Sequence, residues 1–314
     1  MRTQRKSFQG ARYRFDCEFK NHLNLPDYPG SILRSAFGMA LRHIACVTGR
    51  KTCQGCPLSS ECVYIKVFDS AGVASSQISG ISLTPYVIES SIVKSKTNSS
   101  CFIYGFHMVV HDIALKHLPL LVLAWQKALA CGLGNKRIAG KLVSVVRCQK
   151  GSQNLCVWSE DQPRISPHDT TIHLDIPVDR NEVVLRFDTP LRLQRKGKIL
   201  GYSDVTSADL ISGCMRRFSA VVARSGEQLD RRSIRELTEQ SKNLVDHKEL
   251  NFVKYSRYSS RQMHKMQLPG LIGFWRIRGD LKPYLTFLYL CEIFHVGKNT
   301  SIGLGKYTID PQFN

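Results

Sequence analysis

Apolar and polar residues alternate along several segments of the chain, and between these segments apolar residues recur with the period of a helix. Residues 12–19 alternate as a half-buried strand does. Pro29, Gly30 and Ser31 then provide a turn and an N-cap for a helix that we expect to run to about Ala45. The further elements of this half are two strands, a helix and a strand, predicted at residues 84–89, 101–110, 118–130 and 142–146.

A second series of the same kind follows residues 160–167, a polar stretch that we interpret as a linker. Its elements are two strands, a helix with Ser207 as its N-cap, two strands, a helix and a strand, predicted at residues 171–176, 182–187, 207–224, 253–258, 271–278, 281–294 and 306–309. Each half is compatible with a β-α-β-β-α-β, ferredoxin-like unit. The sequence therefore predicts an α+β protein with one domain at residues 1–160 and another at 168–314.

The balance of charge favours a polyanionic partner. The 314 residues include 44 Lys and Arg against 25 Asp and Glu, which gives a formal net charge of +19. This charge favours RNA, DNA or an anionic membrane surface, and a merely basic soluble protein is the alternative. Three stretches poor in acids, at residues 28–60, 113–159 and 254–306, indicate a shared surface for an anion rather than one basic tail.

The sequence does not suggest a membrane protein or a secreted one. It contains no apolar run of about 18 residues, the length that a transmembrane helix needs. The basic residues at the N-terminus are not followed by the apolar region of a signal peptide. We therefore expect a cytoplasmic protein.

Four cysteines are spaced as Cys46-x6-Cys53-x2-Cys56-x5-Cys62 within a loop at residues 46–62. In a cytosolic protein, clustered thiols bind metal more often than they form disulfides. Four thiolates suit tetrahedral zinc, which would stabilise a loop too polar to fold on its own core. An iron–sulfur cluster can use the same ligands, and ordinary reduced cysteines are the remaining alternative.

Residues 295–307 form a glycine-rich segment with the lysines Lys298 and Lys306. Its glycines are Gly297, Gly303 and Gly305. Glycine permits positive φ and close approach of a ligand, and exposed backbone N–H groups beside the lysines are able to cradle phosphates. A tight turn requires the same residues. The segment is neither a P-loop nor a dinucleotide-binding fingerprint.

Basic residues are interleaved with tyrosines and serines at residues 254–262. Lys254, Arg257, Tyr258 and Arg261 suit phosphate contacts combined with base stacking. A solvated strand edge is the alternative interpretation.

Short motifs are spread over nearly the whole chain. They are Leu33-Arg34-Ser35-Ala36-Phe37-Gly38 with Leu41-Arg42, Cys53-x2-Cys56-Pro57-Leu58, Arg257-Tyr258-Ser259-Ser260-Arg261-Gln262, Gly270-Leu271-Ile272-Gly273, Gly279-Asp280-Leu281, His295-Val296-Gly297-Lys298 and Gly303-Leu304-Gly305. In this order and spacing the set resembles the CRISPR precursor-RNA processing endoribonucleases of the RAMP superfamily. The resemblance implies two tandem ferredoxin-like (RRM-like) domains, a C-terminal glycine-rich loop and binding of CRISPR repeat RNA. Where the wider family often has a further glycine, two positions before Gly297, this chain has His295.

The resemblance also implies metal-independent cleavage of RNA. The ribose 2′-OH attacks the adjacent phosphate and leaves a 2′,3′-cyclic phosphate and a 5′-OH. This reaction needs a base for the 2′-OH, an acid for the leaving oxygen and positive charge on the phosphorane. Among the side chains, histidine is suited to such proton transfers near neutral pH.

His43 is the first candidate for this chemistry. It lies on the flank of the first predicted helix, roughly 90° from the apolar stripe, among Arg42, Arg50 and Lys51. Family members that use a tyrosine, a histidine and a lysine place the histidine on this helix. The resemblance therefore implies that Lys51 stabilises the phosphorane and that Tyr28 orients or protonates. A surface or capping histidine is the alternative for His43, and His295 is the second candidate. The candidates for RNA binding are Arg34, Arg42, Lys254, Arg257, Tyr258, Arg261, Gly297, Lys298, Gly303, Gly305 and Lys306.

Three functions are compatible with the sequence. The first is a sequence-specific endoribonuclease that cuts repeat RNA and stays bound to it, with other subunits of a CRISPR effector complex as its partners. The second is an RNA-binding subunit of such a complex without turnover. The third, a zinc-containing regulator that binds DNA, is less favoured because the sequence has no obvious helix-turn-helix.

Overall fold

The computed structural model describes residues 2–69, 84–96, 102–149, 151, 153–222, 230–259 and 264–310. The chain divides into two compact units. We call Gln9–Ile172 the first unit, and Met1–Phe8 together with His173–Asn314 the second unit. The first strand, β1 (Thr3–Phe19), contributes its opening residues to the second unit and the rest to the first.

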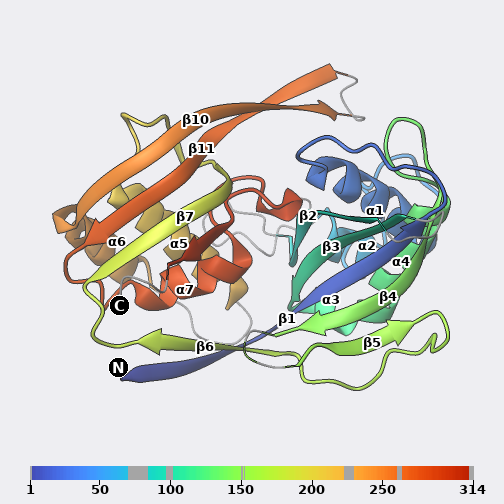
Figure 1. The fold of residues 1–314 in the computed structure, drawn as a ribbon, viewed down its shortest axis with the longest axis horizontal. Coiled ribbons are helices and arrows are strands. Elements are labelled where there is room, and N and C mark those ends of the chain that lie inside the picture. Colours follow the sequence, from blue (N-terminus) through green and yellow to red (C-terminus); the bar gives the residue numbers. More distant parts are fainter. Residues whose placement is uncertain are drawn as a thin grey trace. The chain divides into compact units, whose positions relative to one another are not determined.

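The first unit is built on an antiparallel sheet with the strand order β2-β3-β1-β4-β5 (Figure 1). Its strands after β1 are β2 (Tyr86–Lys96), β3 (Phe102–His111), β4 (Gly140–Cys148) and β5 (Leu155–Ser159). Its helices are α1 (Gly30–Ala45), the short α2 (Val63–Val67) and α3 (Ile113–Lys116), and α4 (Leu118–Ala130). With α1 after β1 and α4 after β3, this is the predicted ferredoxin-like arrangement.

The core of the first unit follows the apolar period of the sequence. On β1 the inward residues Tyr13, Phe15 and Phe19 are fully buried. On α1 the residues on one face are buried, and the ring of Phe37 stacks on Trp125 of α4 with centroids 5.2 Å apart. The burial of these large aromatic side chains stabilises the packing of both helices on the sheet.

The second unit repeats this topology with its own sheet, in the order β10-β11-β7-β12. The strands are β7 (Glu182–Leu191), β10 (Val245–Ser259), β11 (His264–Arg278) and β12 (Tyr307–Ile309). The helices are α5 (Ser207–Val221), α6 (Arg231–Gln240) and α7 (Leu285–Phe294), with 3₁₀ turns at Ser241–Asn243 and Thr300–Ile302. Three further strands are β6 (Thr171–Pro177), which pairs with β1, and the hairpin of β8 (Gln194–Arg195) and β9 (Lys198–Ile199). The α+β, twice ferredoxin-like fold predicted from the sequence is therefore confirmed.

One helix start differs from the prediction. Helix α5 is capped by Thr206 and not by Ser207, because Thr206 has the extended backbone of an N-cap and forms a capping box with Asp209. Ser207 is instead buried, and its hydroxyl donates to the Ser241 carbonyl. Helix α1 begins at Gly30 with Pro29 as its N-cap, within the predicted turn of Pro29, Gly30 and Ser31.

Helix α6 was not predicted from the sequence. None of its residues is buried, and only Ile234 and Leu237 are apolar, which is too few to mark a core-facing helix by apolar spacing. Its N-cap is Asp230, whose carboxylate accepts from the backbone N–H groups of Arg232 and Ser233. In the described part of the chain, no helix is both long and apolar enough to span a membrane.

Candidate functional site

His43 lies in the last turn of α1 and is exposed. Its imidazole makes no hydrogen bond or ion pair with any other described residue. The same turn carries Arg42, and the chain continues into the cysteine-containing loop at residues 46–62. This end of α1 therefore presents an accessible proton-transfer group next to positive charge.

Arg42 fastens the loop to the helix. Its Nη2 donates to the Lys51 carbonyl at 2.7 Å and to the Arg50 carbonyl at 2.5 Å, and Arg50 in turn donates from Nη1 to the Gly55 carbonyl at 2.8 Å. The guanidinium of Arg42 thus holds the backbone of Lys51 beside the helical turn that carries His43. The side chain of Lys51 is exposed. Arg42, predicted to bind RNA, has a structural role in the loop.

Tyr28 does not join this group. Pro29, the N-cap of α1, has helical dihedrals, so Tyr28 lies just beyond the first turn, whereas His43 lies in the last. At 1.5 Å per residue, the two Cα atoms are about 20 Å apart, more than the two side chains can bridge. An unbroken helix thus separates Tyr28 from His43, and the role given to Tyr28 stays a prediction.

Arg34 is packed against the protein. Its guanidinium lies 4.1 Å from the centre of the Phe68 ring, and Nη2 donates to the Phe68 carbonyl at 3.3 Å. Tyr86, whose phenol is fully buried, lies nearby, and burial raises its pKa although the charge of Arg34 acts to lower it. The described contacts of Arg34 are thus those of a half-buried cation–π packing residue.

The four motif cysteines, Cys46, Cys53, Cys56 and Cys62, line one surface cavity of about 250 Å³. The hydroxyl of Thr48 lies 3.9 Å from the sulfur of Cys46 and 3.7 Å from that of Cys56. Hydrogen bonds from Thr48 and from the Gly49 backbone lower the pKa of Cys46, whereas burial raises the pKa of Cys53. In the described residues, no three His, Cys, Asp or Glu side chains are arranged so that they could hold a metal ion. The thiols therefore share a cavity, but their sulfurs do not form a coordination sphere as they stand.

The glycine-rich segment wraps around the end of β7. The N–H of Lys298 donates to the Arg192 carbonyl at 2.9 Å, and the N–H of Gly305 donates to the Pro190 carbonyl at 3.0 Å. A Cβ on Gly297 would lie 2.7 Å from the Arg192 oxygen, and one on Gly305 would lie 1.8 Å from the oxygen of Val296. These two glycines are required because protein backbone approaches them closely.

This packing removes four amides from the expected phosphate cradle. Besides Lys298 and Gly305, the N–H of Gly303 donates to the Thr300 carbonyl and that of Lys306 to the Thr189 hydroxyl. Since protein acceptors occupy these four amides, they are not free to bind an anion. The side chain of Lys298 is exposed and that of Lys306 half-buried.

His295 and Arg217 support the segment from inside. His295 is fully buried, which removes it from the candidates for proton transfer to a ligand. Arg217, on α5, hydrogen-bonds through Nη2 to the hydroxyl of Thr300, and burial lowers the pKa of Arg217 to about 10. Arg217 was not among the residues predicted from the sequence. The sequence feature that could have identified it is a cation on the helix face formed by the buried residues Leu210, Cys214 and Phe218 of α5.

Lys254 is exposed on β10. Arg257 and Tyr258 lie further along the same strand, paired with Met266 and Lys265 of β11. Arg261 lies outside the described residues. The ladder thus places three of these four candidates on one strand of an antiparallel pair.

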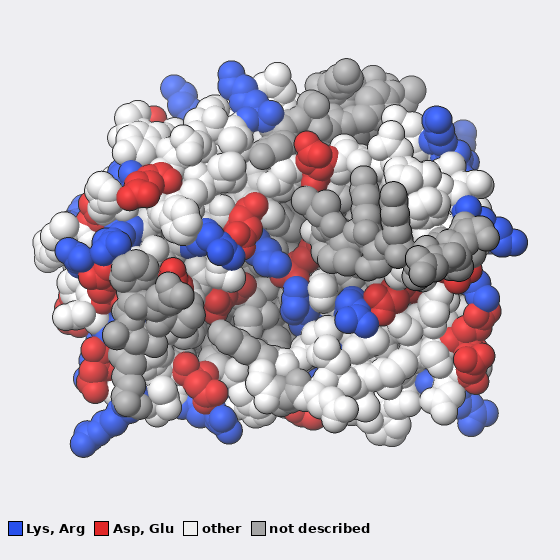
Figure 2. Space-filling model, in the orientation of Figure 1, with Lys and Arg blue, Asp and Glu red and all other residues white. Residues whose placement is uncertain are grey.

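The stretches that are poor in acids along the sequence have acidic residues as neighbours in the folded protein. Arg276 and Arg278 of β11 both pair with Glu182 of β7, at 2.9 and 2.5 Å, and Arg147 of β4 pairs with Asp169 at 3.1 Å. Figure 2 shows lysines and arginines interspersed with acidic residues on the visible face. Within the described contacts, neither Arg34 nor Arg42 at α1 has a carboxylate partner.

Two family models match parts of this chain. A family model described as CRISPR-associated endoribonuclease Cas6 matches residues 185–307, and a family described as an N-terminal domain (AF_1859_N) matches residues 8–170. No curated protein matches the sequence.

Similar solved structures share the fold at low sequence identity. A Cas6 (TTHB231) product complex is 15% identical with a TM-score of 0.58, and covers 96% of this chain and 99% of its own. Thermus thermophilus Cas6 (TTHB231) is 13% identical with a TM-score of 0.53, at 96% and 98% coverage. A Cas6 (TTHA0078) product complex is 15% identical with a TM-score of 0.51, at 96% and 99% coverage.

Proposed function

The chain belongs to the CRISPR-associated precursor-crRNA processing family, and from this premise we propose that it cleaves CRISPR precursor RNA within the repeats. The family's activity is endoribonucleolytic, so the substrate class is RNA. The net charge of +19 agrees with a polyanionic substrate.

The proposed reaction is the attack of the ribose 2′-OH on the adjacent phosphate without a catalytic metal. The O2′–P bond forms, the P–O5′ bond breaks, and the products are a 2′,3′-cyclic phosphate and a 5′-OH. His43 exchanges a proton with the 2′-OH or the leaving 5′-oxygen, and Lys51 places its ammonium beside the phosphorane. The observation that carries this assignment is the Arg42 clamp, which holds Lys51 at the helical turn that exposes His43.

The test of the reaction is cleavage of a panel of repeat RNAs in the presence of EDTA. We expect cleavage to persist with the chelator, and a strict need for an added divalent metal would contradict the mechanism. Replacing the 2′-OH at the cut site by hydrogen should abolish cleavage and leave binding intact, because the nucleophile is then missing. Normal cleavage of the deoxy substrate would exclude 2′-OH attack.

The protein is further proposed to remain bound to its product as a subunit of a crRNA effector complex. An enzyme of this kind completes about one turnover, because the product occupies the site that binds the repeat. Cleavage with RNA in excess over protein measures this directly. A burst equal to the protein concentration is expected, and continuous turnover would contradict retention. Binding without any burst would favour the alternative, an RNA-binding subunit that does not cleave.

A structural zinc ion at Cys46, Cys53, Cys56 and Cys62 is also part of the proposal. All four thiols line one cavity, in a loop without long secondary structure. Binding of the metal would draw the sulfurs together and stabilise the loop that carries Lys51. The zinc is structural and takes no part in the cleavage step.

A further inference from the structure

The β8–β9 hairpin is a small cationic element that the candidate residues above do not include. Gln194 pairs with Ile199 and Arg195 with Lys198, so Lys196 and Gly197 form a two-residue turn. Both turn residues have positive φ, 47° and 85°, as in a type I′ turn. The four residues from Arg195 to Lys198 are exposed.

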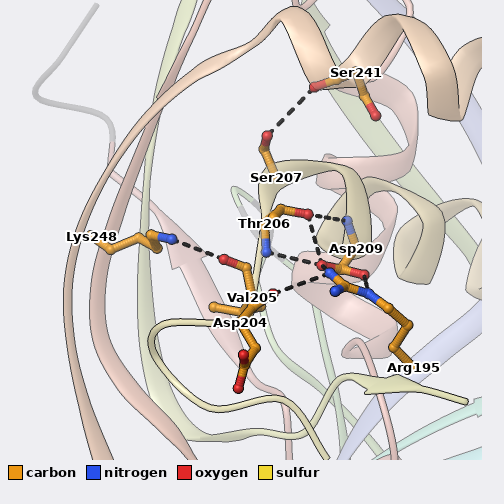
Figure 3. A network of polar contacts seen from close by, with 8 residues as sticks. All are labelled: Arg195, Asp204, Val205, Thr206, Ser207, Asp209, Ser241 and Lys248. Atoms are coloured by element: carbon orange, nitrogen blue, oxygen red, sulfur yellow. Dashed lines mark hydrogen bonds and ion pairs between the residues drawn. The ribbon is translucent and has the colours of Figure 1, made fainter.

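One arginine of the hairpin is neutralised and serves as its anchor. Figure 3 shows Arg195 paired with Asp209 on α5; Nε lies 3.0 Å from Oδ1, and Nη2 also contacts Oδ2. The same Nη2 donates to the Asp204 carbonyl at 3.1 Å. Asp209 also completes the capping box of α5, so the hairpin is fixed to the first turn of that helix.

The two lysines of the hairpin are left as exposed charges. Lys198 lies directly across the ladder from Arg195, whose charge Asp209 compensates, which reduces the repulsion between the two cations. Neither Lys196 nor Lys198 has a carboxylate partner among the described residues. Lysines of this kind bind phosphates as point charges and do not read bases.

The base of the hairpin is bonded to the glycine-rich segment. Arg192 pairs with Gly297 in a parallel bridge, and its carbonyl accepts the N–H of Lys298 at 2.9 Å. Helix α5 holds both parts, since Asp209 binds the hairpin and Arg217, two turns later, binds Thr300 of the segment. The backbone of Lys298, whose side chain is exposed, is thus held at the base of the hairpin.

We propose that Lys196, Lys198 and Lys298 form one cationic strip that binds the phosphates of the RNA backbone. The proposal rests on the proposed function and names a sequence-independent part of its RNA site. The backbone at Lys196 supports it: the first central position of a type I′ turn favours Asn, Asp or Gly, so the lysine that this chain has there lowers the stability of the turn.

The turn provides a test that separates folding from binding. In the full-length protein, Lys196→Asn removes the charge and suits the positive φ, so its unfolding temperature should equal or exceed that of the wild type. Binding of labelled polyuridylate, measured by anisotropy against salt, should weaken about five-fold at 0.1 M salt for each lysine removed, Lys196→Asn or Lys198→Gln. The slope of log affinity against log salt should fall by about 0.7 for each.

Lys282→Gln is the matched control. Lys282 is exposed and follows Gly279, whose N–H donates to the Asn181 carbonyl at the start of β7. The ten residues of β7 place it about 30 Å from Arg192, which follows the end of that strand. Lys282→Gln makes the same change in net charge and should leave the salt slope unchanged.

The outcomes distinguish this proposal from the proposed function. Wild-type slopes in both lysine variants, or an equal loss in the control, would overturn the strip while cleavage of repeat RNA still supports the enzyme. Failure of the wild type to bind either polyuridylate or repeat RNA would overturn both. Weaker binding with an unchanged or higher unfolding temperature would support the strip.

Discussion

The imidazole of His295 donates a hydrogen bond from Nδ1 to the carbonyl of Leu304, 3.2 Å away, and so joins the two ends of the glycine-rich segment. The backbone of His295 has φ 59° and ψ 166°, a conformation in which glycine is nearly always found. The wider family resembled by this sequence often has glycine at this position. Here the buried side chain and its hydrogen bond maintain the conformation instead.

We predict that His295→Ala lowers the free energy of unfolding by about 2 kcal/mol, because the hydrogen bond and the buried ring are lost while the strained backbone remains. His295→Gly loses the same contacts but relieves the backbone, so it should be about 1 kcal/mol less destabilising than Ala. Denaturant unfolding of the two variants measures the difference. Equal stability, or a more stable Ala variant, would contradict the role given to the backbone.

Asp209 should contribute to the acid sensitivity of the protein. Burial acts to raise its pKa, but hydrogen bonds from Arg195 and Thr206 prevail and lower it from 3.8. A depressed pKa in the folded state gives stability that is present above the unfolded value and is lost as pH falls through the folded one. Asp209→Asn should therefore be less stable than the wild type at neutral pH, by about 1 kcal/mol, and the difference should vanish at low pH.

Unfolding free energies measured across this pH range check the prediction. Asp204→Asn is the control, since it removes a neighbouring carboxylate and leaves the Asp209 ion pair in place. A difference between the wild type and Asp209→Asn that persists unchanged in acid would show that the ion pair is not its source.

Arg42→Gln should loosen the cysteine-containing loop without unfolding the first unit. The side chain donates to two loop carbonyls, and hydrogen bonds from a charged donor contribute about 1.5–3 kcal/mol. We expect amide hydrogen exchange in residues 46–62 to accelerate about ten-fold or more. Lys20→Gln, an exposed site of the same unit with the same charge change, is the control. Equal protection of the loop in both variants would contradict the clamp.

His43→Ala should lower single-turnover cleavage of the repeat RNA by on the order of 10²-fold or more if the imidazole transfers a proton. Stability should not change, because the side chain is exposed and makes no polar contact with other described residues. His22→Ala, a second exposed histidine of the first unit, should cleave normally. An undiminished rate in His43→Ala would remove His43 from the mechanism.

Purified protein should contain about one zinc per chain, measured by elemental analysis. The double variant Cys53→Ser and Cys56→Ser should lose the metal and lower the unfolding temperature, because binding energy at a structural site is folding energy. Cys131→Ser, which changes an exposed cysteine outside the loop, is the control. Absence of metal together with free titration of all four loop thiols would reject the site.

The elements of both sheets were largely predictable because amphipathic periods are local. The predicted helix at residues 118–130 coincides with α4, and the alternation at residues 12–19 lies within β1. Strand β1 begins earlier, at Thr3, and β10 begins at Val245 instead of Val253. Those extensions are formed by ladder hydrogen bonds to distant strands, which apolar spacing does not report. Helix α6 was missed because it buries no residue.

The sequence by itself determined the order of strands and helices, the family resemblance and the residue types suited to RNA. Only the tertiary structure decided which of those residues act together. In the folded protein, Tyr28 and His43 lie at opposite ends of α1. The side chain of Arg42 donates to the backbone of the loop, and Arg276 pairs with Glu182 on the neighbouring strand. Several backbone N–H groups of the glycine-rich segment donate hydrogen bonds to protein carbonyls. Secondary structure follows from spacing within a few residues, whereas a site depends on partners that lie far apart in the chain and meet only when the backbone has folded.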